Sequence, residues 1–230
     1  MTDAATTTAT GRPLAVVVLV GEAEHGDPWH ALDQTGRRAA EVIADELGQA
    51  VSVRLARTSD DAETLLDGAD VAVLDVSGDL AEPETDSSAL VDALSAHLSA
   101  GRGLLALHSS AIAFRDDPRW AALLGGRWVP GVTMHPQIGH ALVQTSGVVG
   151  APPESDFVLY DERYTHLETD EGVEVLAFHT EDGIAHPLVW RAEAPGRGRV
   201  AYDALGHGVE SFDSAKHRAL LAALVRWVAS

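Results

Sequence analysis

The sequence predicts an α/β domain built on a mostly parallel sheet. Two observations lead to this prediction. Short apolar runs recur along the first half of the chain, and such runs are typical of strands that are buried on both faces; they are Leu14–Val20, Val71–Val76 and Leu104–Leu107. Helical periodicity separates them, and alternating strands and helices with short connections indicate right-handed crossovers between parallel strands.

The first half is therefore expected to run strand, helix, strand, helix, strand, helix, strand. A helix from Ala31 to Leu47 ends at Gly48, which is a typical C-cap residue. Asp60 and Glu63 resemble a capping box that opens a short helix. The remaining expected segments are a frayed tail over 1–13, a strand at Val51–Leu55, an acidic loop over 77–87 and a helix at Leu90–Leu98 closed by Gly101.

The second half is expected to be richer in β structure. A helical turn at Trp120–Leu124 precedes several shorter strands, at Ala141–Thr145, Phe157–Leu159, Val173–Phe178, Leu188–Ala192 and Gly198–Leu205. These strands either extend the sheet or form a flap over its edge. Ser214 caps a last helix, whose inward residues are Leu220, Leu221, Leu224 and Val228. No repeat or linker divides the chain, so we expect one domain over residues 14–230.

Composition limits the partners and the chemistry. The formal charge of −19 argues against nucleic acid and anionic membranes, because both require basic patches. The chain contains no cysteine, which excludes disulfides, thiolate metal ligands and a cysteine nucleophile. The start of the chain has no signal-peptide pattern and no apolar run reaches membrane-spanning length, so we expect a cytoplasmic protein.

Several histidines follow predicted strands, where an open parallel sheet binds its ligands. His108 comes directly after Leu104–Leu107, and His207 lies between two glycines that allow the backbone to approach a ligand closely. A packing role for His108 is an equal alternative. Ser109 is a poor candidate for a nucleophile, because the small flanking residues of a nucleophile elbow are missing.

Other polar and aromatic residues are weaker candidates. Asp161 and Glu162 are adjacent, so on an extended chain only one of them is expected to face a site. His135 and His140 do not match a helical metal motif, so a divalent metal is an alternative and not an indication. His25 and His30 follow the first strand. Three aromatic residues in loops could stack on a sugar or belong to the core, namely Trp29, Trp128 and Tyr164.

In combination, these segments resemble the ThuA-like family, named for trehalose utilisation, within the class I glutamine amidotransferase-like superfamily. The resemblance covers nearly the whole chain, and its specificity lies in the joint order of the motifs. These are Gly101-x-Gly103 followed by LLALHS, Leu124-Gly125-Gly126-Arg127, Met134-His135-Pro136, Asp161-Glu162-Arg163-Tyr164, Pro187-Leu188-Val189-Trp190, Gly196-x-Gly198-Arg199-Val200-x-Tyr202 and Leu205-Gly206-His207.

The resemblance implies a flavodoxin-like three-layer sandwich with a ligand crevice at the carboxyl ends of the strands. It places His108 where amidotransferases carry their cysteine nucleophile, so glutamine hydrolysis through a thioester is not available to this chain. It also implies a carbohydrate substrate. Proteins of this fold often pair, so a homodimer is an expectation for which the sequence offers no feature.

Two functions follow as hypotheses. The first is an enzyme, a hydrolase, lyase or isomerase, that acts on a keto-sugar or glycoside by acid–base or metal-assisted chemistry. Its catalytic residues would be His108, Glu162 and His207; substrate would be bound by Trp29, His30, Ser109, Trp128, His135 and Tyr164. The alternative is a sugar-binding or sensing module without catalysis. The number of histidines favours the enzyme, because a sugar binder needs mainly neutral polar groups and aromatic rings.

Overall fold

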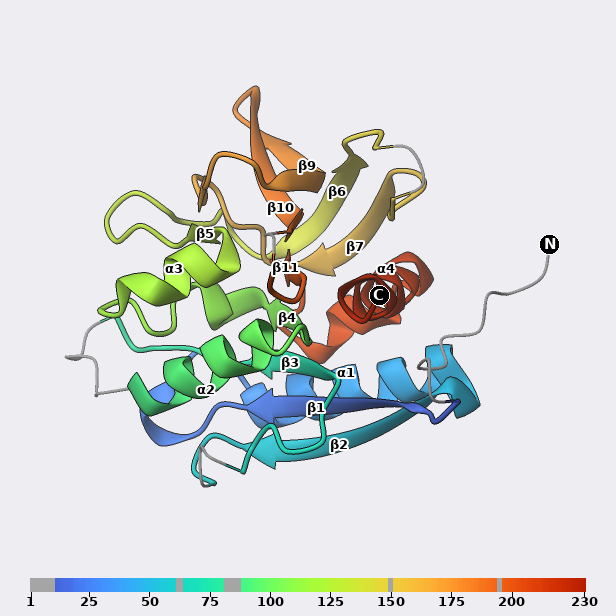
Figure 1. The fold of residues 1–230 in the computed structure, drawn as a ribbon. Coiled ribbons are helices and arrows are strands. Elements are labelled where there is room, and N and C mark those ends of the chain that lie inside the picture. Colours follow the sequence, from blue (N-terminus) through green and yellow to red (C-terminus); the bar gives the residue numbers. More distant parts are fainter. Residues whose placement is uncertain (1–10, 61–63, 81–87, 149–150, 194–195) are drawn as a thin grey trace.

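The computed structural model describes residues 11–60, 64–80, 88–148, 151–193 and 196–230. Within these residues a sheet of nine strands runs through the molecule in the order β2-β1-β3-β4-β11-β10-β9-β6-β7 (Figure 1). The parallel part comprises β1 (Leu14–Val20), β2 (Val51–Arg57), β3 (Val71–Asp75), β4 (Gly103–Leu107) and β11 (Val200–Asp203). The antiparallel part comprises β6 (Gly139–Thr145), β7 (Phe157–Asp161), β9 (Glu174–Glu181) and β10 (Ile184–Ala192).

This arrangement confirms a mixed α/β fold with a large, mostly parallel sheet. It also decides between the two alternatives for the second half, because β10, β9, β6 and β7 extend the sheet beyond β11. A separate short pair is formed by β5 (Gly126–Arg127) and β8 (Glu168–Thr169). The finer expectation of a flavodoxin-like three-layer sandwich stays a prediction.

Four α-helices accompany the sheet in the described part of the chain: α1 (Leu32–Leu47), α2 (Ser88–Ser99), α3 (Pro118–Leu124) and α4 (Ala215–Val228). Gly48 follows α1 with a φ of +57°, a conformation that glycine adopts at little cost. Ser214 caps α4 as predicted, since its hydroxyl accepts the backbone N–H of His217. The tail, the capping box at Asp60 and the acidic loop fall largely on residues 1–10, 61–63 and 81–87, outside the described residues.

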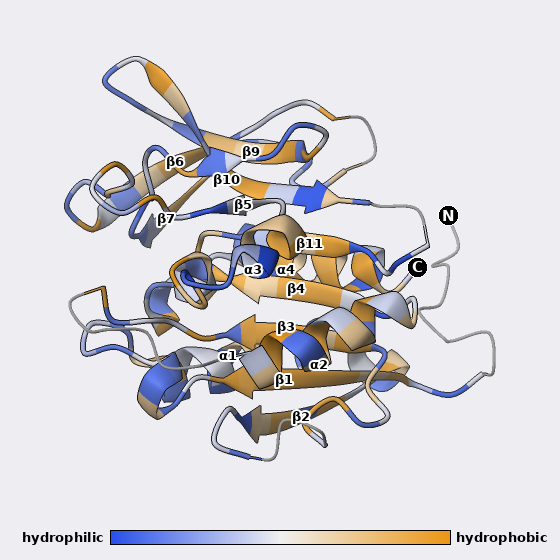
Figure 2. Ribbon diagram, turned by 60° about the vertical axis from the view of Figure 1, so that its left-hand side comes forward, coloured by the Kyte–Doolittle hydropathy of each residue, from blue (hydrophilic) through white to orange (hydrophobic). Residues whose placement is uncertain are grey.

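The hydrophobic core surrounds the parallel strands. Every residue of β3, β4 and β11 is buried, because helices pack on both sides of this part of the sheet. In Figure 2 these strands form the apolar centre of the molecule. Among the described residues, no helix combines the length and the apolar character that crossing a membrane requires.

The topology creates a crevice at one edge of the sheet. From β1 the chain passes through α1 to β2, whereas from β3 it passes through α2 to β4, so the two crossovers leave in opposite directions. In open α/β sheets ligands bind at such a switch point, outside the carboxyl ends of the strands. The loops that follow β1, β3, β4 and β11 therefore meet at the place where a site is expected.

Acid is expected to destabilise the fold through three buried histidines that lie outside this crevice. Burial lowers the pKa of His25, His97 and His179 in the folded chain from the ordinary value of 6.5. Below pH 6.5 the unfolded chain therefore binds protons that the folded chain does not. Each histidine then removes up to about 1.4 kcal/mol of unfolding free energy per pH unit as the pH falls.

Urea unfolding between pH 7.5 and 5.5 measures this loss. His97→Gln keeps a donor for the carbonyl oxygen of Gly103, which lies 3.0 Å from His97 Nε2, and removes one titration. The variant should therefore show a smaller pH slope than the wild type. Equal pH slopes for the wild type and His97→Gln would contradict a lowered pKa of His97 in the folded chain. His217 has the opposite effect on the pH slope, because Asp203 raises its pKa in the folded chain despite burial.

Candidate active site

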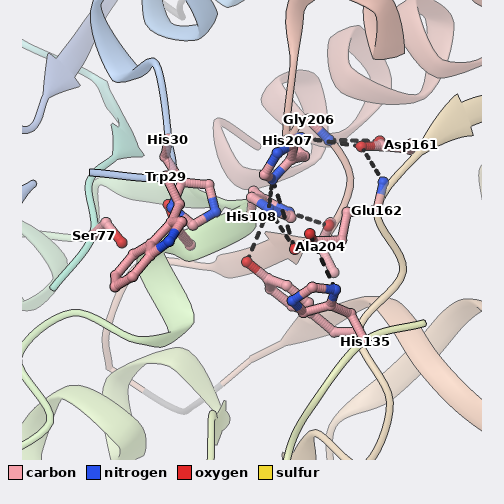
Figure 3. Close-up of polar contacts among 12 residues, drawn as sticks. Trp29, His30, Ser77, His108, His135, Asp161, Glu162, Ala204, Gly206 and His207 are labelled. Atoms are coloured by element: carbon pink, nitrogen blue, oxygen red, sulfur yellow. Dashed lines mark hydrogen bonds and ion pairs between the residues drawn. The ribbon is translucent and has the colours of Figure 1, made fainter. Parts of the chain in front are cut away.

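Four ionisable side chains converge at the carboxyl edge of the sheet (Figure 3). They are His30, His108, Glu162 and His207, and their nearest nitrogen and oxygen atoms all lie within 4.8 Å of one another. Each comes from a different loop, since His108 and Glu162 directly follow β4 and β7, and His30 and His207 lie in the loops after β1 and β11. We call this set the convergent cluster.

His108 is fixed from three directions. Its backbone has a φ of +37°, which is unusual for a residue with a side chain and marks a tight turn at the end of β4. Its Nδ1 donates to the carbonyl oxygen of Ala204 at 2.7 Å, and its own carbonyl oxygen accepts the hydroxyl of Tyr202 at 2.6 Å. Burial, and then the neighbouring His30, hold the His108 pKa well below its ordinary value. His108 is therefore neutral, with the lone pair on Nε2.

That lone pair faces the other members of the cluster. Tyr164 Oη lies 2.9 Å from His108 Nε2, His207 Nδ1 lies 3.3 Å away and Glu162 Oε1 lies 3.7 Å away. Burial raises the Tyr164 pKa well above 10, so its hydroxyl remains protonated and can donate. The Tyr164 ring also stacks on His108, with ring centroids 4.5 Å apart.

His207 is held by its own backbone. Gly206 has a φ of +109°, which turns the chain back toward the sheet. Asp161 accepts the N–H of Gly206 at 2.8 Å and that of His207 at 3.1 Å. Burial, together with His30 and His135, lowers the His207 pKa to about 4. The side chain is 22 % exposed, so solvent reaches the cluster at this point.

Glu162 connects the cluster to His135. Its Oε1 lies 3.6 Å from His207 Nδ1, and its Oε2 lies 3.2 Å from His135 Nδ1. Burial raises the Glu162 pKa, although His135 and His30 act against this rise. A carboxyl group with a raised pKa is better suited to take or give a proton than an ordinary surface carboxylate.

His30 is oriented by Asp27, which sequence reasoning did not select. His30 Nδ1 lies 2.6 Å from Asp27 Oδ2, and this carboxylate also accepts the N–H groups of Trp29 and His30 and the Ser77 hydroxyl. Burial opposes ionisation of Asp27, but these bonds and the charge of His30 lower its pKa to about 2. His30 Nε2 is buried and has no hydrogen-bond partner.

The structure brings most of the candidate residues to one place and leaves others outside it. His108, Glu162 and His207 come together as expected, and His30, His135 and Tyr164 join them. Trp29 is 63 % exposed beside this group, whereas Trp128 is 8 % exposed and packs edge-on against Tyr164, so it supports the wall of the site. The Ser109 hydroxyl donates to the carbonyl oxygen of Val76, away from the cluster.

Two of the candidate histidines, His25 after β1 and His140 within β6, do not join the cluster. His25 packs against Phe114, and His140 pairs with Tyr160 across β6 and β7. Asp161 and Glu162 point in different directions, as the extended backbone requires. Both are nevertheless buried, and Asp161 holds the loop of His207. The guanidinium of Arg163 pairs instead with Glu181, at 3.4 Å. The Asp27-x-x-His30 spacing in the loop after β1 was the sequence signal for the missed carboxylate.

A cavity adjoins the cluster on the side of His30. Its volume is about 660 Å³, within the range of small-molecule sites. Its wall includes Asp27 and one member of the convergent cluster, His30; the other polar residues in the wall are Glu22, Glu24, Asp33, Gln34, Asp79 and Arg115. The cavity gives a sugar-sized molecule room beside the convergent cluster.

Comparisons with solved structures agree with this fold. A ThuA-like protein from Parabacteroides merdae matches with a TM-score of 0.73 and 17% identity, over 95% of this chain and 90% of that one. Another from Bacteroides uniformis matches with a TM-score of 0.70 and 20% identity, over 94% and 91%. A glutamine amidotransferase from Thermotoga maritima matches with a TM-score of 0.55 and 11% identity, over 94% and 96%.

A comparison with curated proteins gives no match. The model of one protein family, ThuA, described as trehalose utilisation, matches residues 17–228. This match spans all but the ends of the chain and includes every member of the convergent cluster. The chain therefore belongs to the ThuA family.

Proposed function

We propose that this protein is an enzyme that acts on a keto-sugar or a keto-glycoside at the convergent cluster. The single observation that carries the proposal is the meeting of Glu162 with His30, His108 and His207 from four separate loops. The family description, trehalose utilisation, supports a carbohydrate substrate. Glutaminase activity through a thioester is excluded chemically, because the chain has no cysteine.

A keto group explains why such a cluster would be useful. It acidifies the neighbouring C–H bond, so a base can remove that proton while the electron pair moves onto the carbonyl oxygen. Hydrolysis, elimination and isomerisation of a keto-sugar can all begin with this step. The site then needs a base and a group that stabilises the developing oxyanion.

The side chains suit these two roles. Glu162, with its raised pKa, and the partly exposed His207 are suited to accept the proton. Tyr164 stays protonated and is suited to donate a hydrogen bond to the oxyanion. The adjoining cavity would hold the sugar, and the exposed indole of Trp29 would stack on one face of its ring.

Exchange of the acidified hydrogen tests the proposal without requiring knowledge of the final product. A 3-keto-glucoside is incubated with the protein in D₂O, and NMR follows the C–H next to the ketone. We expect exchange or turnover that Glu162→Gln and His207→Gln each lower by about 10²–10⁴-fold. His140→Gln serves as a matched control, because His140 lies on β6 away from the cluster.

The parent glucoside without the ketone should show no exchange. Binding of the keto-sugar without exchange or turnover would overturn the proposal and support a non-catalytic sugar-binding module. Equal activity in the wild type, Glu162→Gln and His207→Gln would show that the chemistry takes place elsewhere.

A further inference from the structure

We propose that the convergent cluster binds one divalent transition-metal ion through His30 Nε2, His108 Nε2, His207 Nδ1 and Glu162 Oε1. This inference concerns the site on which the proposed function rests. Metal binding can nevertheless be measured without any substrate, so the two proposals can fail separately. The separations of the ligand atoms, a buried nitrogen of His30 without a partner, the residues behind the ligands and the charge of the site all favour a bound ion.

The separations of three of these atoms match those of ligands around a metal. His108 Nε2, His207 Nδ1 and Glu162 Oε1 are 3.3, 3.6 and 3.7 Å apart. The centre of a triangle with these sides lies about 2.0 Å from each corner, which is the usual length of a Zn–N or Zn–O bond. An ion placed near this centre therefore reaches all three atoms without rearrangement of the backbone.

His30 contributes a buried ring nitrogen that has no hydrogen-bond partner. Its side chain is only 8 % exposed, and its Nε2 is buried without a hydrogen-bond partner. In the tautomer whose Nδ1–H donates to Asp27, the lone pair of the His30 ring is on Nε2. One ring nitrogen of His30 lies within 4.8 Å of a ligand atom of each of the other three residues. A buried lone pair without a donor is costly, and a cation at the centre of the cluster would satisfy it.

The atoms behind the ligands have the arrangement found around metal-binding histidines. Such histidines usually donate their second N–H to a carboxylate or a backbone carbonyl, which fixes the ring and its tautomer. His30 does so to Asp27, and His108 does so to Ala204. The second oxygen of Glu162 faces His135 at 3.2 Å, which leaves Oε1 to the cluster.

The charges favour a divalent ion. Two buried carboxylates, Glu162 and Asp27, bring a formal charge of −2 to the site, which a divalent cation would balance. A cation would also resolve a conflict at His108, where the single lone pair of Nε2 faces both Tyr164 Oη and His207 Nδ1. Three imidazoles with one carboxylate suit Zn²⁺ or another late first-row ion better than Mg²⁺ or Ca²⁺, which prefer oxygen ligands.

Metal analysis of protein purified without a histidine tag tests the inference. We expect one equivalent of metal per chain and, after removal by a chelator, one site for added Zn²⁺ in a calorimetric titration. Co²⁺ in the same site should give the strong visible absorption of a four-coordinate ion. Glu162→Gln and His207→Gln should each weaken Zn²⁺ binding by at least 100-fold, and Asp27→Asn by about 10–100-fold.

His140→Gln again serves as the control and should leave Zn²⁺ affinity and the Co²⁺ spectrum unchanged. Circular dichroism verifies that each variant is folded. Glu162→Gln preserves the side-chain shape and so keeps the test valid if another variant does not fold. Absence of a stoichiometric site in the wild type would overturn the inference. So would equal Zn²⁺ uptake by the wild type, Glu162→Gln and His207→Gln, which would leave the cluster as a proton relay only.

Discussion

Asp161→Asn is expected to lower the free energy of unfolding by about 3 kcal/mol and to release the loop that carries His207. The Asp161 carboxylate receives four donors, two on each oxygen. Oδ1 accepts the N–H groups of Glu162 and His207, and Oδ2 accepts the N–H of Gly206 and the Ser211 hydroxyl. An asparagine has only one such oxygen. In either orientation its NH₂ group would face at least one backbone N–H, which cannot turn away.

Urea unfolding measures the loss of stability, and the keto-sugar exchange assay reports on the release of His207. Asp182→Asn is the matched control, because Asp182 is exposed in the turn between β9 and β10. Its φ of +50° is one that asparagine tolerates well. If both variants had the stability of the wild type, the role assigned to Asp161 would be wrong.

Gly21→Ala is expected to disrupt the loop that carries Asp27 and His30. A Cβ atom at Gly21 would lie 2.0 Å from the carbonyl oxygen of His25, closer than any real contact. That oxygen cannot simply move, because it accepts the backbone N–H of Ser77 at 2.8 Å. We expect a loss of about 3 kcal/mol or more in unfolding free energy, since the backbone at the end of β1 must shift.

Gly26→Ala provides a control within the same loop. A Cβ atom there would meet its nearest neighbour, the carbonyl oxygen of Ala23, at an ordinary 3.6 Å. This variant should therefore keep wild-type stability and activity in the exchange assay, while Gly21→Ala loses both. Similar behaviour of the two alanine variants would contradict the close packing at Gly21.

Local sequence signals were sufficient for the strands and for the main members of the site. The apolar run before His108 marks a buried strand, and the glycines around His207 mark a sharp turn, so both residues could be placed at the same edge of the sheet. Glu162 could be placed there as well, because it follows a strand-like segment. In each case the signal lies within a few residues of the side chain concerned.

The remaining features depend on contacts between distant segments. Trp29 and Trp128 are both loop aromatics in the sequence, yet one is exposed and the other is covered by Tyr164. The roles of Asp27 and Asp161 likewise depend on how loops far apart in the chain meet. Periodicity and composition do not describe how these loops meet, so the role of Asp161 could not be assigned from the sequence. For Asp27 the sequence signal was limited to its spacing of three residues from His30.

The position of β11 has a consequence for how the chain folds during synthesis. β11 lies between β4 and β10, so the edge of β4 stays unpaired until the last strand has left the ribosome. All five residues of β4 are buried in the finished protein, which makes this edge a place where a nascent or truncated chain can aggregate. Pairing over such a long sequence separation is intrinsically slow. Docking of β11 thus completes the sheet and, in the same step, brings His207 to His108.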